Sequence, residues 1–144
     1  MEQAKEQIGS EARTEPAVLH PLRTPTAVAI CAGAWFVPGL GHIILGRWVR
    51  GLIFAGCVLI MFGLGLAMQG KLYGLAFEDP LQEFAFIANI GAGLPYFLSE
   101  YFGFGAGIMT APSYDYGTTF LWVAGLLNFL IVLDVFDIAK GRKP

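Results

Sequence analysis

The sequence predicts an all-α integral membrane protein with about four transmembrane helices arranged as two hairpins. Hydrophobic residues make up 56% of the 144 residues and charged residues only 14%, whereas a soluble domain carries about 25% charged residues. The charges are also unevenly spread, because residues 1–25 hold seven of the twenty charged residues (nine basic and eleven acidic) and residues 51–70 hold none. This separation of polar ends from uncharged segments is what a lipid solvent requires.

Four long apolar stretches predict the crossing helices. The first has 21 residues without Asp, Glu, Lys or Arg, and about 20 helical residues cross a hydrocarbon core of about 30 Å. We expect one transmembrane domain over residues 26–140, with spans at about residues 26–46, 51–68, 84–102 and 116–138.

Polar segments predict the ends and the connections. Residues 1–25 contain three prolines and lack the apolar middle region of a cleavable signal peptide, so we expect a cytoplasmic tail there. Residues 141–144 form the expected cytoplasmic end. The polar stretch 69–83 and the glycine-rich stretch 103–116 are expected connections. No internal sequence repeat is evident.

The Lys and Arg residues predict a multi-pass protein of the bacterial cytoplasmic membrane with both termini in the cytoplasm, because cytoplasmic loops carry an excess of basic residues. Four spans would put Arg47 and Arg50 in a short outer turn, where Glu100 and Asp115 would be available to pair with them. The other seven basic residues would lie inside: Lys5, Arg13, Arg23, Lys71, Lys140, Arg142 and Lys143.

Proline and glycine predict a kink or break in the first span. Pro38 lacks a backbone donor, and Gly39 and Gly41 add conformational freedom. One interpretation is a kinked helix that packs closely against a neighbour through its glycines, and it is the one we favour. The alternative is a ligand or ion site at exposed backbone groups, as in transporters with discontinuous helices.

A histidine and two arginines follow the predicted break. His42 is an ionisable group within a span, so ligation of a haem or pigment and proton transfer are functional alternatives. The sequence offers it no obvious partner, which favours a hydrogen-bonded structural histidine. Gly46 precedes Arg47, Trp48 and Arg50, and we interpret these three side chains as interfacial anchors rather than catalytic groups.

The last predicted span carries polar side chains at two depths. Asp134 and Asp137 share a helix face near its end, with Lys140 three residues further on. A carboxylate pair at this place could bind a cation or exchange protons, but a solvated helix end with weak pairing of Asp137 and Lys140 is the simpler interpretation. Asn128 lies deeper, where its amide can hydrogen-bond to another helix.

Two groups of residues resemble a known kind of protein. Together they resemble an uncharacterised family of small bacterial polytopic membrane proteins, distantly similar to the two-transmembrane-helix domain superfamily. The resemblance implies an architecture and no activity, and the Asp-Arg-Phe turn of the two-helix domains is absent from this sequence. The residues that carry it are Pro38, Gly39, Gly41, His42, Leu45, Gly46, Arg47, Arg50 and Gly51, with Gly117–Phe120, Ala124–Asn128, Asp134, Asp137–Ala139 and Gly141–Lys143.

These patterns favour a non-enzymatic scaffold or accessory subunit that works by helix association. Its expected partners are membrane lipids and either a second copy or a larger membrane complex. No catalytic cluster is evident, no cofactor or metal is expected, and a net charge of −2 without a basic run argues against nucleic acid. Cys31 and Cys57 lie in apolar segments as small hydrophobic residues. Small residues recur four apart, as helix association requires, at Ala29/Gly33, Gly51/Ala55, Gly63/Ala67 and Ala88/Gly92.

Two rival functions remain open from the sequence. The first is a small transporter or channel component that uses the broken first helix, His42 and the acidic residues of the last span. It requires these groups to converge on a water-accessible cavity. The second is an intramembrane enzyme whose catalytic residues would come from a partner or from a constellation that the sequence does not reveal.

Overall fold

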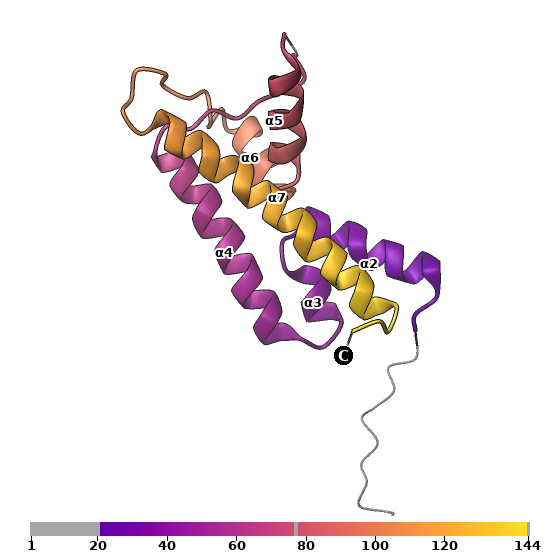
Figure 1. Cartoon of the computed structure of the whole chain (residues 1–144). Coiled ribbons are helices and arrows are strands. Elements are labelled where there is room, and N and C mark those ends of the chain that lie inside the picture. Colours follow the sequence, from indigo (N-terminus) through magenta and orange to yellow (C-terminus); the bar gives the residue numbers. More distant parts are fainter. Residues whose placement is uncertain (1–20, 77, 144) are drawn as a thin grey trace, which may run out of the picture.

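All regular structure in the described part of the chain is helical, as predicted (Figure 1). The computed structural model describes residues 21–76 and 78–143, so most of the predicted tail (residues 1–20) and the last residue lie outside it. The six helices are α2 (Thr24–Phe36), α3 (Leu40–Ile44), α4 (Trp48–Ala67), α5 (Pro80–Ile90), α6 (Leu94–Tyr101) and α7 (Tyr114–Ala139).

Two of these helices, α4 and α7, are long and apolar enough to cross a membrane. They have 20 and 26 residues, so each extends at least about 30 Å. Only 22% and 33% of their most apolar windows are buried, whereas the core helix of a soluble protein is mostly buried. The other two expected spans, residues 26–46 and 84–102, are each broken into two short helices, so the described structure holds two long helices rather than four.

The long helices run antiparallel and pack against each other, and α7 lies at the centre of the fold (Figure 1). Buried side chains of both, including Val58, Phe62 and Leu121, belong to one apolar core. Glycines bring the end of α4 against the start of α7: a Cβ on Gly65 would lie 2.9 Å from the carbonyl oxygen of Gly117. The backbones therefore approach more closely than any larger residue allows.

The first broken segment, α2 with α3, enters the fold and returns to the end at which it began. At the entry, the Leu22 amide donates to the Ala139 carbonyl at the end of α7 (3.0 Å). At the return, the His42 ring lies 3.0 Å from Asp134, again near the end of α7. The tip of the broken segment, at Trp35, instead contacts Asn128. Asn128 lies 11 residues, roughly 16 Å, before Ala139 along α7.

The break in this segment has a local cause. α2 ends at Phe36, and Gly39 adopts a left-handed φ of +82° before α3 begins. Pro38 lacks an amide donor and cannot continue the helix. The sequence therefore predicts the place of the break correctly, but after the break the chain turns back and does not complete a crossing.

The second broken segment, α5 with α6, enters from the opposite end of the molecule (Figure 1). α5 runs beside α7, with the Phe84 ring 6.1 Å from the ring of Trp122. Gly93 has a φ of +70°, and Pro95 follows it in the first turn of α6. Beyond α6 the chain returns to the end of α4, where the Leu72 amide donates to the Gly105 carbonyl (2.8 Å).

The described chain thus contains one structural pattern twice. A helix, a glycine-containing break, a shorter helix and a long apolar helix occur in residues 24–67 and again in residues 80–139. The two long helices point in opposite directions, so the second unit is inverted relative to the first (Figure 1). The sequence does not reveal this repeat.

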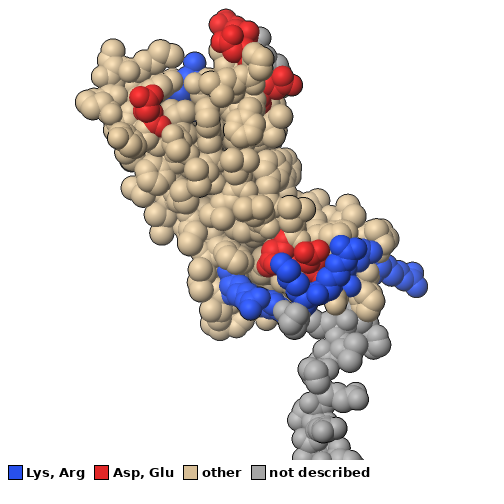
Figure 2. Space-filling view, in the orientation of Figure 1, with Lys and Arg blue, Asp and Glu red and all other residues tan. Residues whose placement is uncertain are grey.

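Charged residues gather at the two ends of the molecule (Figure 2). Six of the seven described basic residues lie at the end where α4 begins and α7 finishes, and only Lys71 lies at the other end. Arg47 and Arg50 were expected opposite Lys140, Arg142 and Lys143, and this prediction is wrong because the first segment turns back. At the basic end lie Arg23, Arg47, Arg50, Lys140, Arg142 and Lys143; at the other lie Lys71, Glu78, Asp79, Glu83, Glu100 and Asp115.

Candidate functional site

A buried histidine and an acidic residue of the last helix form the first candidate site. His42 is fully buried, and its Nε2–H donates to the Asp134 carboxylate over 3.0 Å. The ring packs against Phe54, with the centroids 5.0 Å apart, and its Nδ1 has no hydrogen-bond partner among the described residues. The sequence suggested no partner for His42, and this was wrong because Asp134 lies 92 residues away in the chain.

Basic side chains at the end of the chain close this site from outside. The Lys143 ammonium lies 2.9 Å from the second oxygen of Asp134, and this hydrogen bond raises the pKa of Lys143. Asp137 pairs with Arg142 at 3.7 Å and with Lys143 at 3.9 Å. The expected Asp137–Lys140 pair does not form, since the Lys140 ammonium donates to the Thr24 hydroxyl instead.

The arrangement is a charge cluster that joins α3, α7 and the segment after α7. Asp134 is 28% exposed while His42 is fully buried, so the cluster lies at the boundary between the interior and the polar end. Because a buried ring nitrogen left without its hydrogen-bond partner is costly, the His42–Asp134 contact fixes the returning hairpin on α7. Of the two predicted carboxylates, Asp134 contacts His42, and Lys143 and Arg142 occupy the place that a cation bound by the pair would take.

The glycines of the break serve close packing. A Cβ on Gly39 would collide with the Gly51 carbonyl oxygen of α4. One on Gly41 would lie 2.7 Å from the side chains of Ala34 and Val135. These contacts correspond to the simpler interpretation of the sequence, in which the glycines let the broken segment pack against neighbouring helices.

A second candidate site lies where the tips of the two broken segments meet. The fully buried Asn128 amide donates to the carbonyls of Trp35 (2.9 Å) and Gly91 (2.8 Å). Gly93 lies so close that a Cβ there would collide with the Trp35 carbonyl oxygen. Asn128 therefore satisfies a backbone carbonyl from each tip, as unwound backbone in an apolar interior requires.

The sequence reasoning missed the second half of this junction. It identified Asn128 as a residue that hydrogen-bonds between helices, but it treated residues 84–102 as one span. A signal was present, because Gly91 and Gly93 precede Pro95 much as Gly39 and Gly41 follow Pro38. Two Gly-x-Gly pairs beside a proline mark both breaks.

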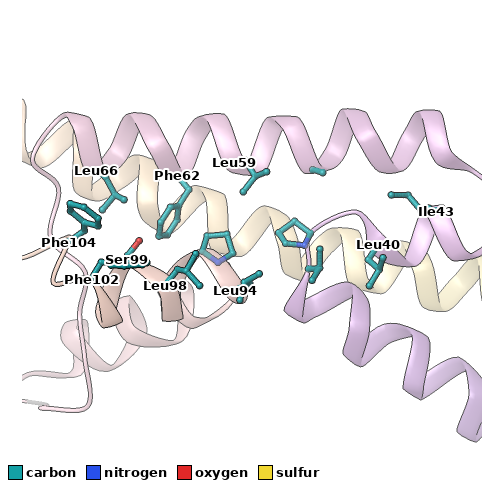
Figure 3. A pocket seen from close by; sticks show the side chains of 14 residues that line it. Leu40, Ile43, Leu59, Phe62, Leu66, Leu94, Leu98, Ser99, Phe102 and Phe104 are labelled. Carbon is teal, nitrogen blue, oxygen red and sulfur yellow. The ribbon is translucent and has the colours of Figure 1, made fainter.

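An apolar groove runs along α4 beside this junction (Figure 3). Its volume is about 510 Å³. Both broken segments line it, the first through residues such as Pro38 and Ile43 and the second through residues such as Pro95 and Leu98. Phe62 of α4 is 4% exposed and lies at its base, while Leu59 is 51% exposed at its margin. The groove is therefore open along one side.

The arginines after the break lie at the basic end of the molecule. Gly46 has a φ of +78° and turns the chain from α3 into α4. Arg47, Trp48 and Arg50 line a shallow depression there, and Trp48 is 62% exposed. The expected pairing of these arginines with Glu100 and Asp115 is wrong, because those acidic residues lie at the opposite end (Figures 1 and 2).

The two cysteines and the possible metal ligands are the remaining candidate groups in the described residues. Both cysteines are free; Cys57 is exposed, and the Cys31 thiol points to the Val132 carbonyl at 3.9 Å. Within residues 21–76 and 78–143, no three His, Cys, Asp or Glu side chains come together in a way that could hold a metal ion.

Fold and sites together define an all-helical protein with two helices that could cross a membrane and two broken hairpins that meet between them. The chain belongs to a family of unknown function, DUF6677, whose family model matches residues 29–144. No curated protein and no solved structure matches the chain.

Proposed function

We propose that this chain is an integral protein of the bacterial cytoplasmic membrane in which α4 and α7 cross the bilayer and the two broken hairpins enter from opposite faces. The length and exposed apolar surface of the two long helices support this placement. The hairpin tips meet at Asn128, roughly 21 Å from the start of α7 and 16 Å from its end. Unwound backbone there is paired within the protein, as hydrocarbon demands. The proposal includes the distant similarity of this chain to two-transmembrane-helix domains.

The basic end is the cytoplasmic one in this proposal. Six of the seven described basic residues lie there, and cytoplasmic segments of membrane proteins are enriched in Lys and Arg. Leu22 and Ala139 are hydrogen-bonded at the same end, so both ends of the described chain are cytoplasmic. The orientation agrees with the sequence prediction, but Arg47 and Arg50 now support it instead of opposing it.

The function that the geometry supports best is that of a non-enzymatic scaffold or accessory subunit that associates with other membrane helices. One observation carries it: the outer face of α4 is apolar, contains small residues and has no partner among the described residues. A Cβ on Gly56 or Gly63 would meet no atom within 4 Å, and Ile53 and Ile60 on the same face are 57% and 64% exposed. Small residues seven apart, flanked by β-branched ones, allow another helix to approach closely.

This outer face differs from the faces that the chain already uses. Val58 and Gly65 face α7, and Ala55 and Phe62 face the groove. Positions 53, 56, 60, 63 and 67 form a separate stripe, because they are spaced by three or four residues on a 3.6-residue period. Association through this stripe leaves the internal packing unchanged.

The test is the oligomeric state of the full chain in a bilayer. Purification in mild detergent and transfer to lipid nanodiscs should give a dimer, or a complex with an identifiable membrane protein, by mass. Gly63→Leu should convert the assembly to a monomer with unchanged helical content, since the added side chain separates the helices. Val123→Phe, an enlargement by the same number of carbon atoms at an exposed position of α7, is the control. A monomeric wild-type chain, or an assembly that tolerates Gly63→Leu, contradicts the proposal.

Transport is a second candidate function, and it is favoured by the inverted repeat. The two units share one element order and point in opposite directions, and their broken helices meet midway. This arrangement resembles the plan of many secondary transporters. The contact of His42 with Asp134, one part of the convergence that this function requires, is also present. The large groove, however, has an almost wholly apolar lining.

Flux measurements in liposomes separate the two candidates. Transport predicts uptake of a proton or small ion that is lost in His42→Ala, while Ile60→Ala on the outer face of α4 leaves uptake unchanged. Equal uptake into empty liposomes and liposomes that hold the wild-type chain would leave association as the function.

A further inference from the structure

The groove beside α4 has the shape and chemistry of a hydrocarbon site. Its lining is apolar except for Ser99, and it extends beside α4 from Ala55 to Leu66, a distance of roughly 16 Å. The exposed fractions of Leu59 (51%), Leu98 (49%) and Phe104 (62%) show that one side is open to the surroundings. In the proposed placement those surroundings are lipid chains.

A cationic depression adjoins the basic end of this groove. Ile43 lines the groove at that end (Figure 3), and its carbonyl accepts a hydrogen bond from the Gly46 amide (3.1 Å). Gly46 in turn lines the depression with Arg47, Trp48 and Arg50. One turn of chain therefore joins the two features.

The depression lacks a counter-charge within the described chain. Every ion pair among the described residues uses His42, Lys143 or Arg142, so the carboxylates of Asp134 and Asp137 are engaged elsewhere. The first turn of α4 contains no acidic residue, and no side chain caps it. Free amides at a helix start and unpaired guanidinium groups both favour an anion, and arginine binds phosphate oxygens in a bidentate manner.

We propose that the groove and the depression together bind one anionic phospholipid of the cytoplasmic leaflet. One acyl chain lies in the groove between the two broken hairpins, and the headgroup phosphate pairs with Arg47 and Arg50 beside Trp48. The lipid thus covers the surface that both hairpins share. This inference rests on the proposed membrane placement, but not on the association of α4 with another helix.

The charges decide between a lipid and a second protein helix as the occupant. The exposed apolar helix of another copy, α4, contains no acidic residue, so it would fill the groove but bring no anion to the arginines. A phospholipid carries both groups in one molecule, with its phosphate at the membrane interface and its hydrocarbon in the membrane core. The charge complementarity therefore favours the lipid.

The experiment measures lipids bound to the full chain in mild detergent by native mass spectrometry. Phosphatidylglycerol and phosphatidylcholine with identical acyl chains are added in turn. The wild-type chain should retain one phosphatidylglycerol, and Arg47→Gln and Arg50→Gln should each weaken its binding about fivefold, as expected for one basic residue near an anionic surface. Each variant should weaken the binding of phosphatidylcholine less, because the choline cation already compensates the charge of its phosphate.

A matched pair of tryptophan variants tests the groove itself. Leu59→Trp fills the groove and should abolish retention of both lipids, whereas Ile60→Trp, next to it on the outer face of α4, should retain phosphatidylglycerol at the wild-type level. If Leu59→Trp fails to fold, Leu98→Trp fills the groove from α6. Equal phosphatidylglycerol retention by the wild type and both groove variants, or by the wild type and both arginine variants, overturns the proposal.

The outcomes are separable from those of the proposed function. Gly63→Leu should dissociate the assembly but keep the bound lipid. A chain that stays dispersed and compact in buffer without detergent would remove the membrane placement, and with it both proposals.

Discussion

The two halves of the molecule have the same plan but are held in place differently. In residues 24–67, the returning helix α3 is fixed by the His42–Asp134 contact and by glycines that press it against α4 and α7. In residues 80–139, the returning helix α6 has no ionic contact among the described residues, and Tyr101 at its end is 84% exposed. Its Tyr96 hydroxyl donates to the Tyr73 carbonyl over 3.3 Å.

This difference indicates which half is able to move. A hairpin with few buried contacts opens at a lower free energy than one that is fixed at both its tip and its return. The tips are joined through Asn128, so α6 can shift while the junction stays closed. The groove lies between the two hairpins, and movement of α6 would change its width.

The largest effect is expected at the junction that the halves share. Asn128→Leu leaves the buried carbonyls of Trp35 and Gly91 unpaired, and at about 2 kcal/mol for each group the chain should lose about 4 kcal/mol of stability. Unfolding of the full chain in detergent, followed by circular dichroism, measures this loss.

The matched control is Asn89→Leu. Asn89 is also fully buried, but neither atom of its amide has a hydrogen-bond partner among the described residues. Replacement by an apolar residue of similar size should be neutral or stabilising. Equal destabilisation by the two substitutions would show that the contacts of Asn128 do not join the halves.

A smaller effect, confined to the first half, is expected from the charge cluster. Asp134→Ala leaves His42 buried without a partner and should cost about 3 kcal/mol. Asp137→Ala removes only exposed ion pairs and should cost less than about 1 kcal/mol. Hydrogen exchange should show lost protection in α3 for Asp134→Ala and none in α5 or α6. Loss of protection in both hairpins would mean that the halves are not independently anchored.

The smallest effect separates packing from backbone strain in the first hairpin. Gly39 and Gly46 have nearly equal left-handed φ angles, +82° and +78°, so alanine strains both by about 1 kcal/mol. A Cβ on Gly39 also collides with α4, whereas one on Gly46 meets nothing within 4 Å. Gly39→Ala should therefore destabilise the chain by about 2 kcal/mol more than Gly46→Ala does. Equal unfolding midpoints would show that α3 is free to shift.

Several features follow from local rules and were predicted. The apolar runs predicted α4 and α7 within a few residues, since an uncharged run of about 20 residues without an internal proline favours a long helix. Pro38 and Gly39 located the break, because a proline cannot donate its backbone amide and a glycine admits a positive φ. Asn128 was recognised as an amide that would hydrogen-bond between helices.

The direction of the chain after each break could not be predicted from the sequence. A broken helix can continue across or turn back, and the choice depends on which surfaces are available to pack against. For the first segment these are Gly51 and Val135, and for the second they are Gly125 and Phe129. This choice also moved Arg47 and Arg50 to the end opposite to the one expected.

The amino-acid sequence by itself determined that the chain is helical, where its two long helices lie and where its first helix breaks, because each depends on the chemistry of neighbouring residues. The tertiary structure alone decided that two broken hairpins meet at Asn128, that His42 pairs with Asp134 and that a groove forms between the hairpins. These contacts join residues up to 93 positions apart, and their geometry exists only once all four segments have packed together.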